Sequence, residues 1–526
     1  MAKPMVGQMR VNEFESFRSV AKATSKKPAV MTSSHGMRGV MYQRGAPGAP
    51  QTGVRCRAMA FDITQLVADR AGENYALHER HVNPTLVDVF RTIGFDRVYA
   101  RGEGAYLWDD AGDRYLDMLG GFGVAAIGRN NPVVARAIRD VLDMDLPNTV
   151  QMDCALLAGL LAEALVQRTP DHLDAVYFCN SGTEAVEASL KFARAATGRD
   201  RFVHFRGGWH GLTLGSLSVM GGDEFREGFG QLLPGDEVEP GDLAHLERVL
   251  APEDCAAVIV ECVPGHSVRL PPGGFLNEVQ ALCRRYGTLL ICDEVATGYG
   301  RTGTMFAFEQ FGLEPDIIAT SKALSGGYVP VAATICRREI YSAVFSRMDR
   351  CWVHSSSFGR NNLAMAAGLA TLSVLDDDDM LARSARQGRM LVDGINALRD
   401  RHEVLREARG LGCLVAIELQ QPSGGRRKMA WDAVHAMHGS LFPQLVVMPL
   451  LSRHRVLTQV TGTHDPIIRL MPPYVICDDD VAWFVDALDQ VLTRIHRLPG
   501  PMIEMGRNAM RAKMRGRRGR PEPTPA

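Results

Sequence analysis

GTLLICD at residues 287–293 and DIIATSK at residues 316–322 are the stretches that decide the expected fold. Each is a short apolar run that stops at a polar side chain, Asp293 in the first and Lys322 in the second. Such runs predict buried strands of a parallel sheet, and the carboxyl ends of neighbouring parallel strands meet at one edge of the sheet. We therefore expect the Asp293 carboxylate and the Lys322 amine to lie close together.

The same pattern continues on both sides of these two stretches. From about residue 90 onward, short apolar runs alternate with helical periods, which is typical of a mostly parallel sheet covered by helices on both faces. Near Met390 the pattern changes to a helix followed by GLGCLVAIEL at 410–419, which predicts a smaller α+β lobe that reaches about residue 500. The clearest strands of the large lobe are 175–180 (AVYFCN), 256–262 (AAVIVEC), 287–293 and 316–320.

Both ends of the chain differ in composition from the rest. Residues 1–58 carry 10 basic and 2 acidic side chains, and a stretch such as RGAPGAPQTG (44–53) has too little apolar surface to fold. This segment resembles a transit peptide, but we favour a start of translation at Met59. The expected organisation is a disordered basic extension (1–58), a segment that joins the small domain (59–115), a large cofactor-binding domain (116–388), a small domain (389–500) and a disordered basic tail (501–526).

Charge and cysteine usage limit the classes of partner and compartment. Residues 59–500 carry 42 Lys and Arg against 56 Asp and Glu, so the folded body is acidic and no nucleic-acid partner is expected. The 11 cysteines form no CxxC pair, and Cys179, Cys262 and Cys292 fall in predicted buried strands, which indicates reduced thiols and a cytoplasmic location. No apolar run approaches the roughly 18 residues that span a bilayer, so no membrane partner is expected.

Lysine is scarce, which draws attention to Lys322. Between residues 59 and 500 the only lysines are Lys191, Lys322 and Lys428. Lys191 lies on a predicted amphipathic helix and Lys428 in a polar GGRRK loop, so both are interpreted as solvated. Lys322 follows an apolar run, where burial could lower the pKa of the amine and make it nucleophilic; the alternative is an ordinary helix-capping lysine. Paired with Asp293, this amine suits a pyridoxal phosphate enzyme, in which a lysine forms a Schiff base and a carboxylate keeps the pyridine nitrogen protonated.

Two further motifs suit the same cofactor. SGTE at 181–184 follows a predicted strand and starts an alanine-rich helix that stops at Gly198; Ser181 and Glu184 fit a capping box, and a helix N-terminus attracts phosphate. The alternative is a helix start without a ligand. Trp209, in the turn GWHG (208–211), could stack on a planar ring or could be a packing tryptophan, and His210 is interpreted as structural.

Taken together, these motifs resemble the class III aminotransferases, which are pyridoxal phosphate enzymes of fold type I, over roughly residues 85–500. The subgroup looks closest to the putrescine, ornithine and 4-aminobutyrate aminotransferases. The matching stretches are NSGTEAVEASLKFAR (180–194), WHG (209–211), AAVIVE (256–261), LLICDEVATGYGRTG (289–303), PDIIATSKALSGG (315–327), HSSSFGRNN (354–362), IRLMPP (468–473) and LGGFG (119–123).

The resemblance implies a role for each matching position. Lys322 would be the catalytic Schiff-base lysine and Asp293 the partner of the pyridine nitrogen, while Glu261 belongs to the cofactor-binding set. Arg469 would bind the substrate α-carboxylate. Phe122 is our choice for a wall of the substrate pocket, with a core phenylalanine as the alternative. The other implied cofactor contacts are Ser181, Gly182 and Thr183 at the phosphate, Trp209 and Val295 on the two faces of the ring, and Ser357 at the phosphate of the neighbouring subunit.

That last contact makes the active site a property of two subunits, so a homodimer or a tetramer is expected. No metal is implied. The sequence departs from the family pattern at three places: Ala296 replaces a glutamine, Leu212 replaces an arginine of ornithine-type members, and ECVPGHS (261–267) lacks the second glutamate of EPIQGEGG. Because that glutamate screens the carboxylate-binding arginine in ω-aminotransferases, we expect Arg469 to be unscreened.

The expected reaction moves an amino group from an amine or amino acid donor to an oxo acid. Alternatives on the same scaffold are an aminomutase, a decarboxylase or a non-catalytic homologue. A phosphate-binding dehydrogenase is disfavoured because no suitable GxGxxG follows the first strand. The donor and the acceptor stay open at this stage.

Overall fold

The computed structural model describes residues 61–425, 428–429, 431–432, 441–461 and 465–495, so the predicted extension (1–58) and tail (501–526) lie outside the described residues.

The chain divides into two units, 1–69 and 70–526. In the first unit the described part is the short helix α2 (Ile63–Asp69). The Asp62 side chain accepts hydrogen bonds from the backbone N–H groups of Thr64 and Gln65, which satisfies donors that a helix start leaves unpaired.

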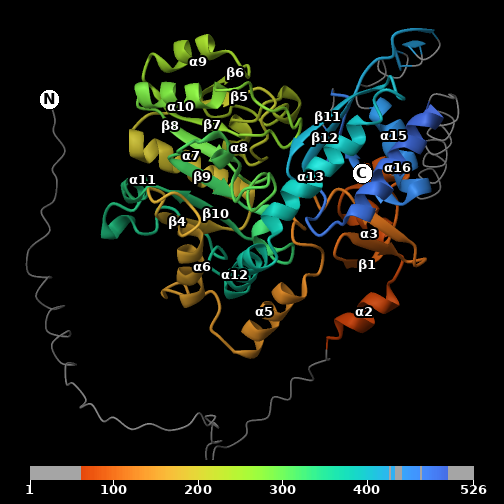
Figure 1. Cartoon of the computed structure of the whole chain (residues 1–526). Coiled ribbons are helices and arrows are strands. Elements are labelled where there is room, and N and C mark those ends of the chain that lie inside the picture. The colour runs from red at the N-terminus through yellow and green to blue at the C-terminus, as the bar shows by residue number, and fades with distance from the viewer. Residues whose placement is uncertain (1–60, 426–427, 430, 433–440, 462–464, 496–526) are drawn as a thin grey trace, which may run out of the picture. The chain divides into compact units, whose positions relative to one another are not determined.

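A seven-stranded sheet with helices around it forms one part of the second unit, on the left in Figure 1. The order of the strands is β4-β10-β9-β8-β7-β5-β6, and only β10 runs antiparallel to its neighbours. The prediction of a mostly parallel α/β sheet is therefore confirmed. The strands are β4 (Ala175–Cys179), β5 (Arg201–Phe205), β6 (Gly235–Val238), β7 (Cys255–Val260), β8 (Leu289–Asp293), β9 (Ile317–Thr320) and β10 (Ala332–Cys336).

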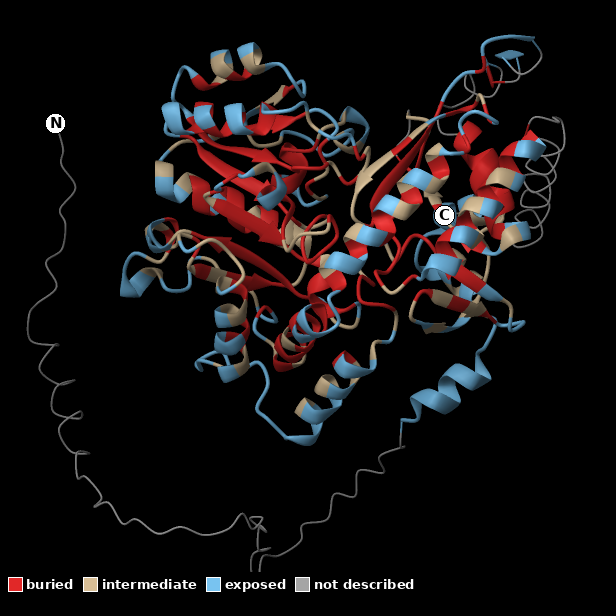
Figure 2. Ribbon diagram, in the orientation of Figure 1, coloured by how far each residue is buried: buried red, intermediate tan, exposed pale blue. Residues whose placement is uncertain are grey.

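Both faces of this sheet are buried, as Figure 2 shows. Alternate residues of one strand enter different apolar clusters: Val258 of β7 packs with one cluster and Ile259 with the other. Helices on both faces explain why these strands read as continuous apolar runs. One cluster includes residues of α5 (Pro132–Asp143), α6 (Leu156–Val166), α9 (Leu243–Leu250), α10 (Phe275–Arg285) and α12 (Asn362–Asp377), and the other includes residues of α7 (Gly182–Thr197) and α11 (Arg338–Val344).

Two smaller sheets accompany the large one. The first has the order β1-β2-β3-β13, so the chain near residue 115 pairs with residues 456–457, and the second has the order β11-β12-β15-β14. The predicted stretch 410–419 contains a hairpin turn at Gly412 (φ +52°) between β11 and β12. The strands are β1 (Tyr99–Glu103), β2 (Tyr106–Asp109), β3 (Arg114–Asp117), β11 (Leu405–Leu411), β12 (Leu414–Leu419), β13 (Val456–Leu457), β14 (Gln459–Val460) and β15 (Ile467–Leu470).

The helices beside these sheets share one apolar cluster, in which Leu116 of β3 joins Ile417 of β12 and Phe484 of α16. The remaining helices are α3 (Asn74–His81), α4 (Pro84–Ile93), α8 (Leu214–Ser218), α13 (Met380–Asn396), α15 (Leu441–His454) and α16 (Asp478–Ile495), with 3₁₀ helices η2 (Asp223–Phe225), η3 (Ala307–Phe311), η4 (Lys322–Ser325) and η5 (Met348–Arg350).

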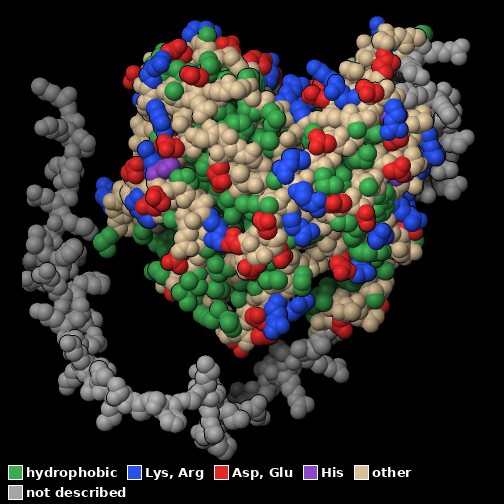
Figure 3. Space-filling view, in the orientation of Figure 1, with side chains coloured by type: hydrophobic (Ala, Val, Ile, Leu, Met, Phe, Trp, Pro, Cys, Tyr) green, Lys and Arg blue, Asp and Glu red, His purple; other side chains and the backbone are tan. Residues whose placement is uncertain are grey.

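Charges of both signs are interspersed over the face drawn in Figure 3. Among the described helices, none has both the length and the apolar character that crossing a bilayer requires.

Candidate active site

The N-terminus of α7 forms the first part of the site. Ser181 is the N-cap, and its Oγ accepts a hydrogen bond from the Glu184 N–H at 3.4 Å. The predicted capping box is only half right, because the Glu184 carboxylate accepts from the Asn180 N–H at 2.7 Å and not from the N–H of Ser181. The predicted end of the helix is confirmed, since Gly198 is the left-handed C-cap (φ +68°).

The first turn of α7 is tightly enclosed. The Thr183 hydroxyl lies 2.7 Å from the Thr213 hydroxyl and 2.6 Å from the Ser216 hydroxyl. A Cβ added to Gly182 would lie 2.6 Å from Cγ1 of Val295, so the helix start can approach Val295 only because residue 182 is a glycine. A helix N-terminus with clustered hydroxyls is suited to bind an anion such as phosphate.

Asp293 and Lys322 leave the large sheet at the same edge, because β8 and β9 are parallel. Asp293 is the last residue of β8, as predicted. Lys322, in contrast, lies two residues beyond the end of β9, at the start of η4, with a left-handed backbone (φ +39°). A non-glycine residue in this region is strained, and such strain is frequent at functional sites.

The Lys322 amine is easier to deprotonate than an ordinary lysine. Burial and then the positive charge of Arg469 lower its pKa from 10.5 to about 8, although Glu261 and Asp293 act in the opposite direction. A substantial fraction of this amine is therefore uncharged near neutral pH. The two other lysines of the body, Lys191 and Lys428, are exposed.

Asp293 is held by a partner that the sequence did not identify. Its Oδ2 accepts a hydrogen bond from Nδ1 of His210 at 2.7 Å, and its Oδ1 accepts from the Val295 N–H at 3.0 Å. Both His210 and Asp293 are buried. The interpretation of His210 as purely structural was incomplete, because this histidine orients a carboxylate of the site.

Trp209 is held in place by its backbone and its ring. The Trp209 N–H donates to Oε2 of the buried Glu261 at 2.8 Å, and Oε1 of the same carboxylate accepts from the Gly265 N–H. Burial raises the pKa of Glu261. The Trp209 ring stacks on His266, with centroids 4.6 Å apart and planes 16° apart, and Phe225 meets it edge-on. His266 stands in the stretch that departs from the family pattern, and that departure was the only sequence signal for it.

Arg469, on β15, is buried and carries little compensation for its charge. Its Nη1 donates to the Gly265 carbonyl at 2.6 Å, while its Nε has no hydrogen-bond partner. Burial lowers its pKa to about 10, so it stays charged at neutral pH. No described acidic side chain forms an ion pair with it, although the negative charge of Glu261 acts to raise its pKa. The ring of Phe122 lies 5.2 Å from the guanidinium and is 45% exposed, which does not fit the alternative of a core phenylalanine.

These side chains line one cavity of about 700 Å³. Of the predicted site residues, Ser181 and Ser357 are not part of its lining. Ser181 caps α7 beside it, and Ser357 is exposed, next to Ser356, whose Oγ accepts a hydrogen bond from the Asn180 side chain at 2.8 Å. The lining also contains residues that sequence reasoning did not select, among them Gln459, Val460 and Thr461 near β14. The predicted residues in the lining are Phe122, Gly182, Thr183, Trp209, Glu261, Asp293, Val295, Lys322 and Arg469.

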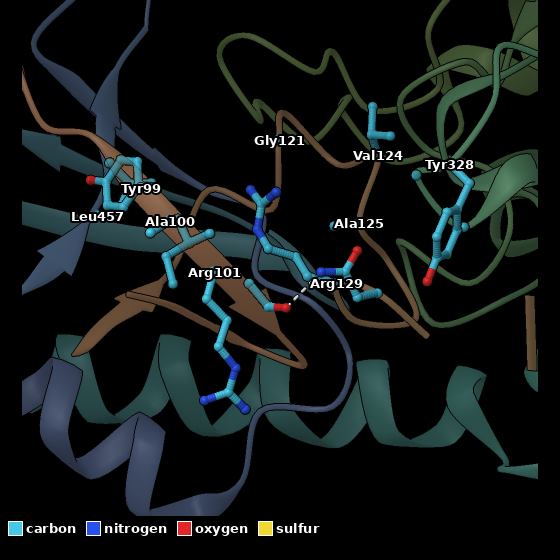
Figure 4. Close-up of a pocket in the computed structure, with 14 residues that line it drawn as sticks. Tyr99, Ala100, Arg101, Gly121, Val124, Ala125, Arg129, Tyr328 and Leu457 are labelled. Carbon is cyan, nitrogen blue, oxygen red and sulfur yellow. Dashed lines mark hydrogen bonds between the residues drawn. The ribbon is translucent and has the colours of Figure 1, made fainter. Parts of the chain in front are cut away.

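A second cavity, of about 760 Å³, is shown in Figure 4. Its lining includes Tyr99, Arg101, Arg129 and Tyr328, and it reaches Gly121, the neighbour of Phe122. It contains no lysine and no carboxylate side chain. The chemistry predicted from the sequence therefore belongs to the first cavity.

Comparison with known proteins identifies the family. The sequence matches the class III aminotransferases over residues 91–492. The chain belongs to this family. Aminotransferase PigE of Serratia sp. (strain ATCC 39006) is 32% identical over 468 residues, which cover 82% of this chain and 55% of PigE, so the chain spans about half the length of that relative.

Solved structures of transaminases share the fold of this class III chain. The ornithine aminotransferase of Toxoplasma gondii ME49 is 27% identical with a TM-score of 0.68, and the match covers 76% of this chain and 91% of that one. An amine transaminase from an uncultivated Pseudomonas species, in its PLP-bound form, is 30% identical with a TM-score of 0.66, covering 76% and 95% of the two chains. The predicted fold type I architecture is confirmed.

The residues around the cavity fit pyridoxal phosphate, the cofactor of class III aminotransferases. The first turn of α7 is suited to the phosphate, since Gly182 and Thr183 reach the cavity there. The buried Asp293 offers a carboxylate oxygen to a ring nitrogen, and Lys322 offers a partly deprotonated amine to an aldehyde.

Proposed function

We propose that this chain is a pyridoxal phosphate-dependent transaminase that moves an amino group from an amine or amino acid donor to an oxo acid. The observation that carries the proposal is the presence of Lys322, Asp293 and the N-terminus of α7 on one cavity. When bound, pyridoxal phosphate supplies an aldehyde that captures amines and a ring that accepts electrons.

The chain's own residues would hold the cofactor from three directions. Gly182 and Thr183 would bind the phosphate with the backbone and hydroxyl donors of α7, and Ser181 caps the same helix. Trp209 and Val295 would enclose the ring. Asp293 would keep the pyridine nitrogen protonated, and the His210 Nδ1–H fixes the carboxylate for that task.

Lys322 would carry the proton transfer. A general base is most effective when its pKa lies close to the working pH, and burial brings this amine to about 8. Nζ of Lys322 would hold the cofactor aldehyde until a donor amine takes its place there. The released, neutral Nζ would then accept a proton from the donor carbon and return it to the neighbouring carbon. The left-handed backbone at Lys322 directs the side chain into the cavity.

Arg469 supports a substrate that carries a carboxylate. Its guanidinium is charged, forms no ion pair with a described acidic side chain although Glu261 raises its pKa, and faces the cavity that contains Lys322. A guanidinium can bind two carboxylate oxygens at once. His266 does not oppose this, because burial and the charges of Arg469 and Lys322 lower its pKa to about 4 and leave it neutral. We therefore propose that α-amino acids and oxo acids are better substrates than diamines.

A donor and acceptor panel tests this function. Purified enzyme is mixed with L-alanine, putrescine or n-butylamine, and the cofactor absorbance is followed before pyruvate is added. A transaminase gives stoichiometric conversion to the pyridoxamine form and a carbonyl product, whereas an aminomutase or a decarboxylase does not. Borohydride should attach the cofactor to Lys322, and Lys322→Ala should abolish both signals while the exposed-site control Lys428→Ala keeps them. Faster reaction of diamines than of α-amino acids would contradict the role of Arg469.

We also propose a homodimer in which Ser357 reaches the cofactor of the other subunit. Segments near 150 and 357 lie side by side, because the Gln151 side chain donates to the Ser357 carbonyl at 3.1 Å. Apolar side chains on these segments are exposed, including Met152 (87%) and Phe358 (63%), which is typical of a surface that another chain covers. A second copy of this chain would explain the exposure of these side chains and the absence of Ser357 from the lining of its own cavity.

Mixed subunits test the dimer. Lys322→Ala and Ser357→Ala protomers are each expected to show reduced activity as homodimers. If Ser357 serves the neighbour's site, a heterodimer contains one site with both changes and one site with neither, so mixing should restore activity above the sum of the parents. Additive activities, or a monomer by light scattering, would refute the shared site.

The buried free thiols of the described residues, such as Cys179 and Cys292, support a cytoplasmic location for this dimer.

A further inference from the structure

Arg301 is a buried cation that the proposed chemistry does not use. It follows β8 in the chain, and its side chain is among the largest that are fully buried. The guanidinium lies over the ring of Tyr474, 4.6 Å from its centroid, and Nε has no hydrogen-bond partner. Within the described residues no acidic side chain forms an ion pair with it. A buried charge is costly unless its surroundings compensate for it, so the contacts that it does make are informative.

Those contacts are backbone carbonyls from three separate segments. Nη1 donates to the Pro472 carbonyl at 2.6 Å and to the Cys413 carbonyl at 3.0 Å, and Nη2 donates to the Gly123 carbonyl at 3.4 Å. Gly123 directly follows Phe122, and Pro472 lies three residues after Arg469. One guanidinium therefore links the two segments that place Phe122 and Arg469 in the wall of the active-site cavity.

The segment that carries Phe122 has little freedom on either side. Phe122 itself has a left-handed backbone (φ +57°), and a Cβ added to Gly120 would lie 2.4 Å from the Met471 carbonyl oxygen. The Asp117 carboxylate accepts from the Gly120 N–H at 2.8 Å and is paired with Arg129 at 2.7 Å. Figure 4 shows the Arg129 side chain extending toward Gly121.

We propose that Arg301 is a positioning residue that sets the spacing between Phe122 and Arg469, and thereby the affinity of the active site for carboxylate-bearing substrates. Arg301 does not line the cavity, so it acts through the two segments that it joins and not by touching substrate. This inference rests on the proposed function. It differs from it because, among the described residues, no hydrogen bond joins Arg301 to Lys322, Asp293 or the first turn of α7. The positive charge of Arg301 does help to lower the pKa of Lys322, and a lysine at position 301 keeps that charge.

Arg301→Lys tests the spacing, because lysine keeps the positive charge near Lys322 but cannot reach three carbonyls with a planar fork. The matched control is Arg199→Lys. Arg199 also donates to backbone carbonyls, those of Tyr286 at 2.8 Å and Gly287 at 3.0 Å, but at the start of β8 and away from the cavity. A second variant, Gly123→Ala, disturbs the same junction and keeps Arg301, since its Cβ would lie 2.7 Å from Cε of Met471.

Two readouts are measured on cofactor-loaded protein: calorimetric binding of butyrate, an unreactive carboxylate, and the half-reactions of L-alanine and n-butylamine. For Arg301→Lys and Gly123→Ala we expect the Kd of butyrate and the KM of L-alanine to rise by about tenfold or more, with kcat and the n-butylamine reaction within about threefold of wild type. Arg199→Lys should match wild type in every readout. The melting temperature of each variant reports whether it is folded.

Unchanged butyrate binding in Arg301→Lys would overturn the inference. An equal loss of activity with L-alanine and with n-butylamine would also overturn it, because that result indicates a merely structural role. If Arg301→Lys does not fold, Gly123→Ala decides between these outcomes. Wild-type protein that binds pyridoxal phosphate but neither binds butyrate nor converts L-alanine would instead refute the carboxylate specificity of the proposed function.

Discussion

The lowered pKa of Lys322 predicts how fast this amine reacts at each pH. A lysine with a pKa of 10.5 is about 0.03% deprotonated at pH 7, whereas one with a pKa of about 8 is about 9% deprotonated, a gain of about 300-fold. Only the neutral amine attacks an aldehyde or an acylating reagent. The rate of modification of Lys322 should therefore rise about tenfold per pH unit below pH 8 and level off above it.

The assay labels cofactor-free protein with a neutral acylating reagent between pH 6 and 10.5 and measures the modified peptides by mass spectrometry. The scarcity of lysine makes the measurement clean, and the exposed Lys428 reports the reactivity of the reagent in the same sample. Arg469→Leu should move the Lys322 midpoint to higher pH, because removing a neighbouring positive charge makes protonation easier. Arg199→Leu serves as the control and should leave the midpoint in place.

Two results would refute this reasoning. A Lys322 rate that still rises without levelling at pH 10 would mean that the amine is solvated. A midpoint that Arg469→Leu does not move would mean that the guanidinium and the amine do not sense one another across the cavity.

Three further changes test the surroundings of the site and the fold. His210→Phe removes the hydrogen-bond partner of the buried Asp293 carboxylate, and the loss of such a bond costs about 1.5–3 kcal/mol of free energy. We therefore expect the affinity for the cofactor, measured in an absorbance titration, to fall about 10- to 100-fold. Unchanged affinity would contradict the pairing of His210 with Asp293. Gly182→Ala places a Cβ 2.6 Å from Val295 and should weaken cofactor binding. Adding Val295→Ala to the same chain should restore part of the cofactor affinity. A double variant that binds the cofactor no more tightly than Gly182→Ala alone would refute the steric cause. Gly388→Ala directs a Cβ to 1.8 Å from the Gly412 carbonyl oxygen and should destabilise the fold by about 1–3 kcal/mol in a thermal melt. Gly159→Ala, in open space on α6, is the control and should stabilise the fold by about 0.5–1 kcal/mol. Equal melting temperatures of the two variants would contradict the close approach of α13 to the β11–β12 turn.

The local features of the site follow from short stretches of sequence. The end of β8 at Asp293, the N-cap at Ser181 and the Gly198 stop each depend on a few adjacent residues, so a motif predicts them. The edge shared by Asp293 and Lys322 follows from the parallel pairing of two consecutive strands. The motifs also carried the resemblance to class III aminotransferases, because they occur in the same order along the chain.

The contacts that hold those features together depend on residues far apart in the chain. His210 meets Asp293 across 83 positions, and Arg301 meets the Pro472 carbonyl across 171. His266 became a neighbour of Trp209 only when two loops at the ends of different strands converged. No local pattern marks such pairs, because the same histidine or arginine could equally lie on a solvated surface. The sequence alone therefore determined which groups are available for chemistry, and the tertiary structure decided which of them are buried together, since burial and charge compensation arise only when the segments pack.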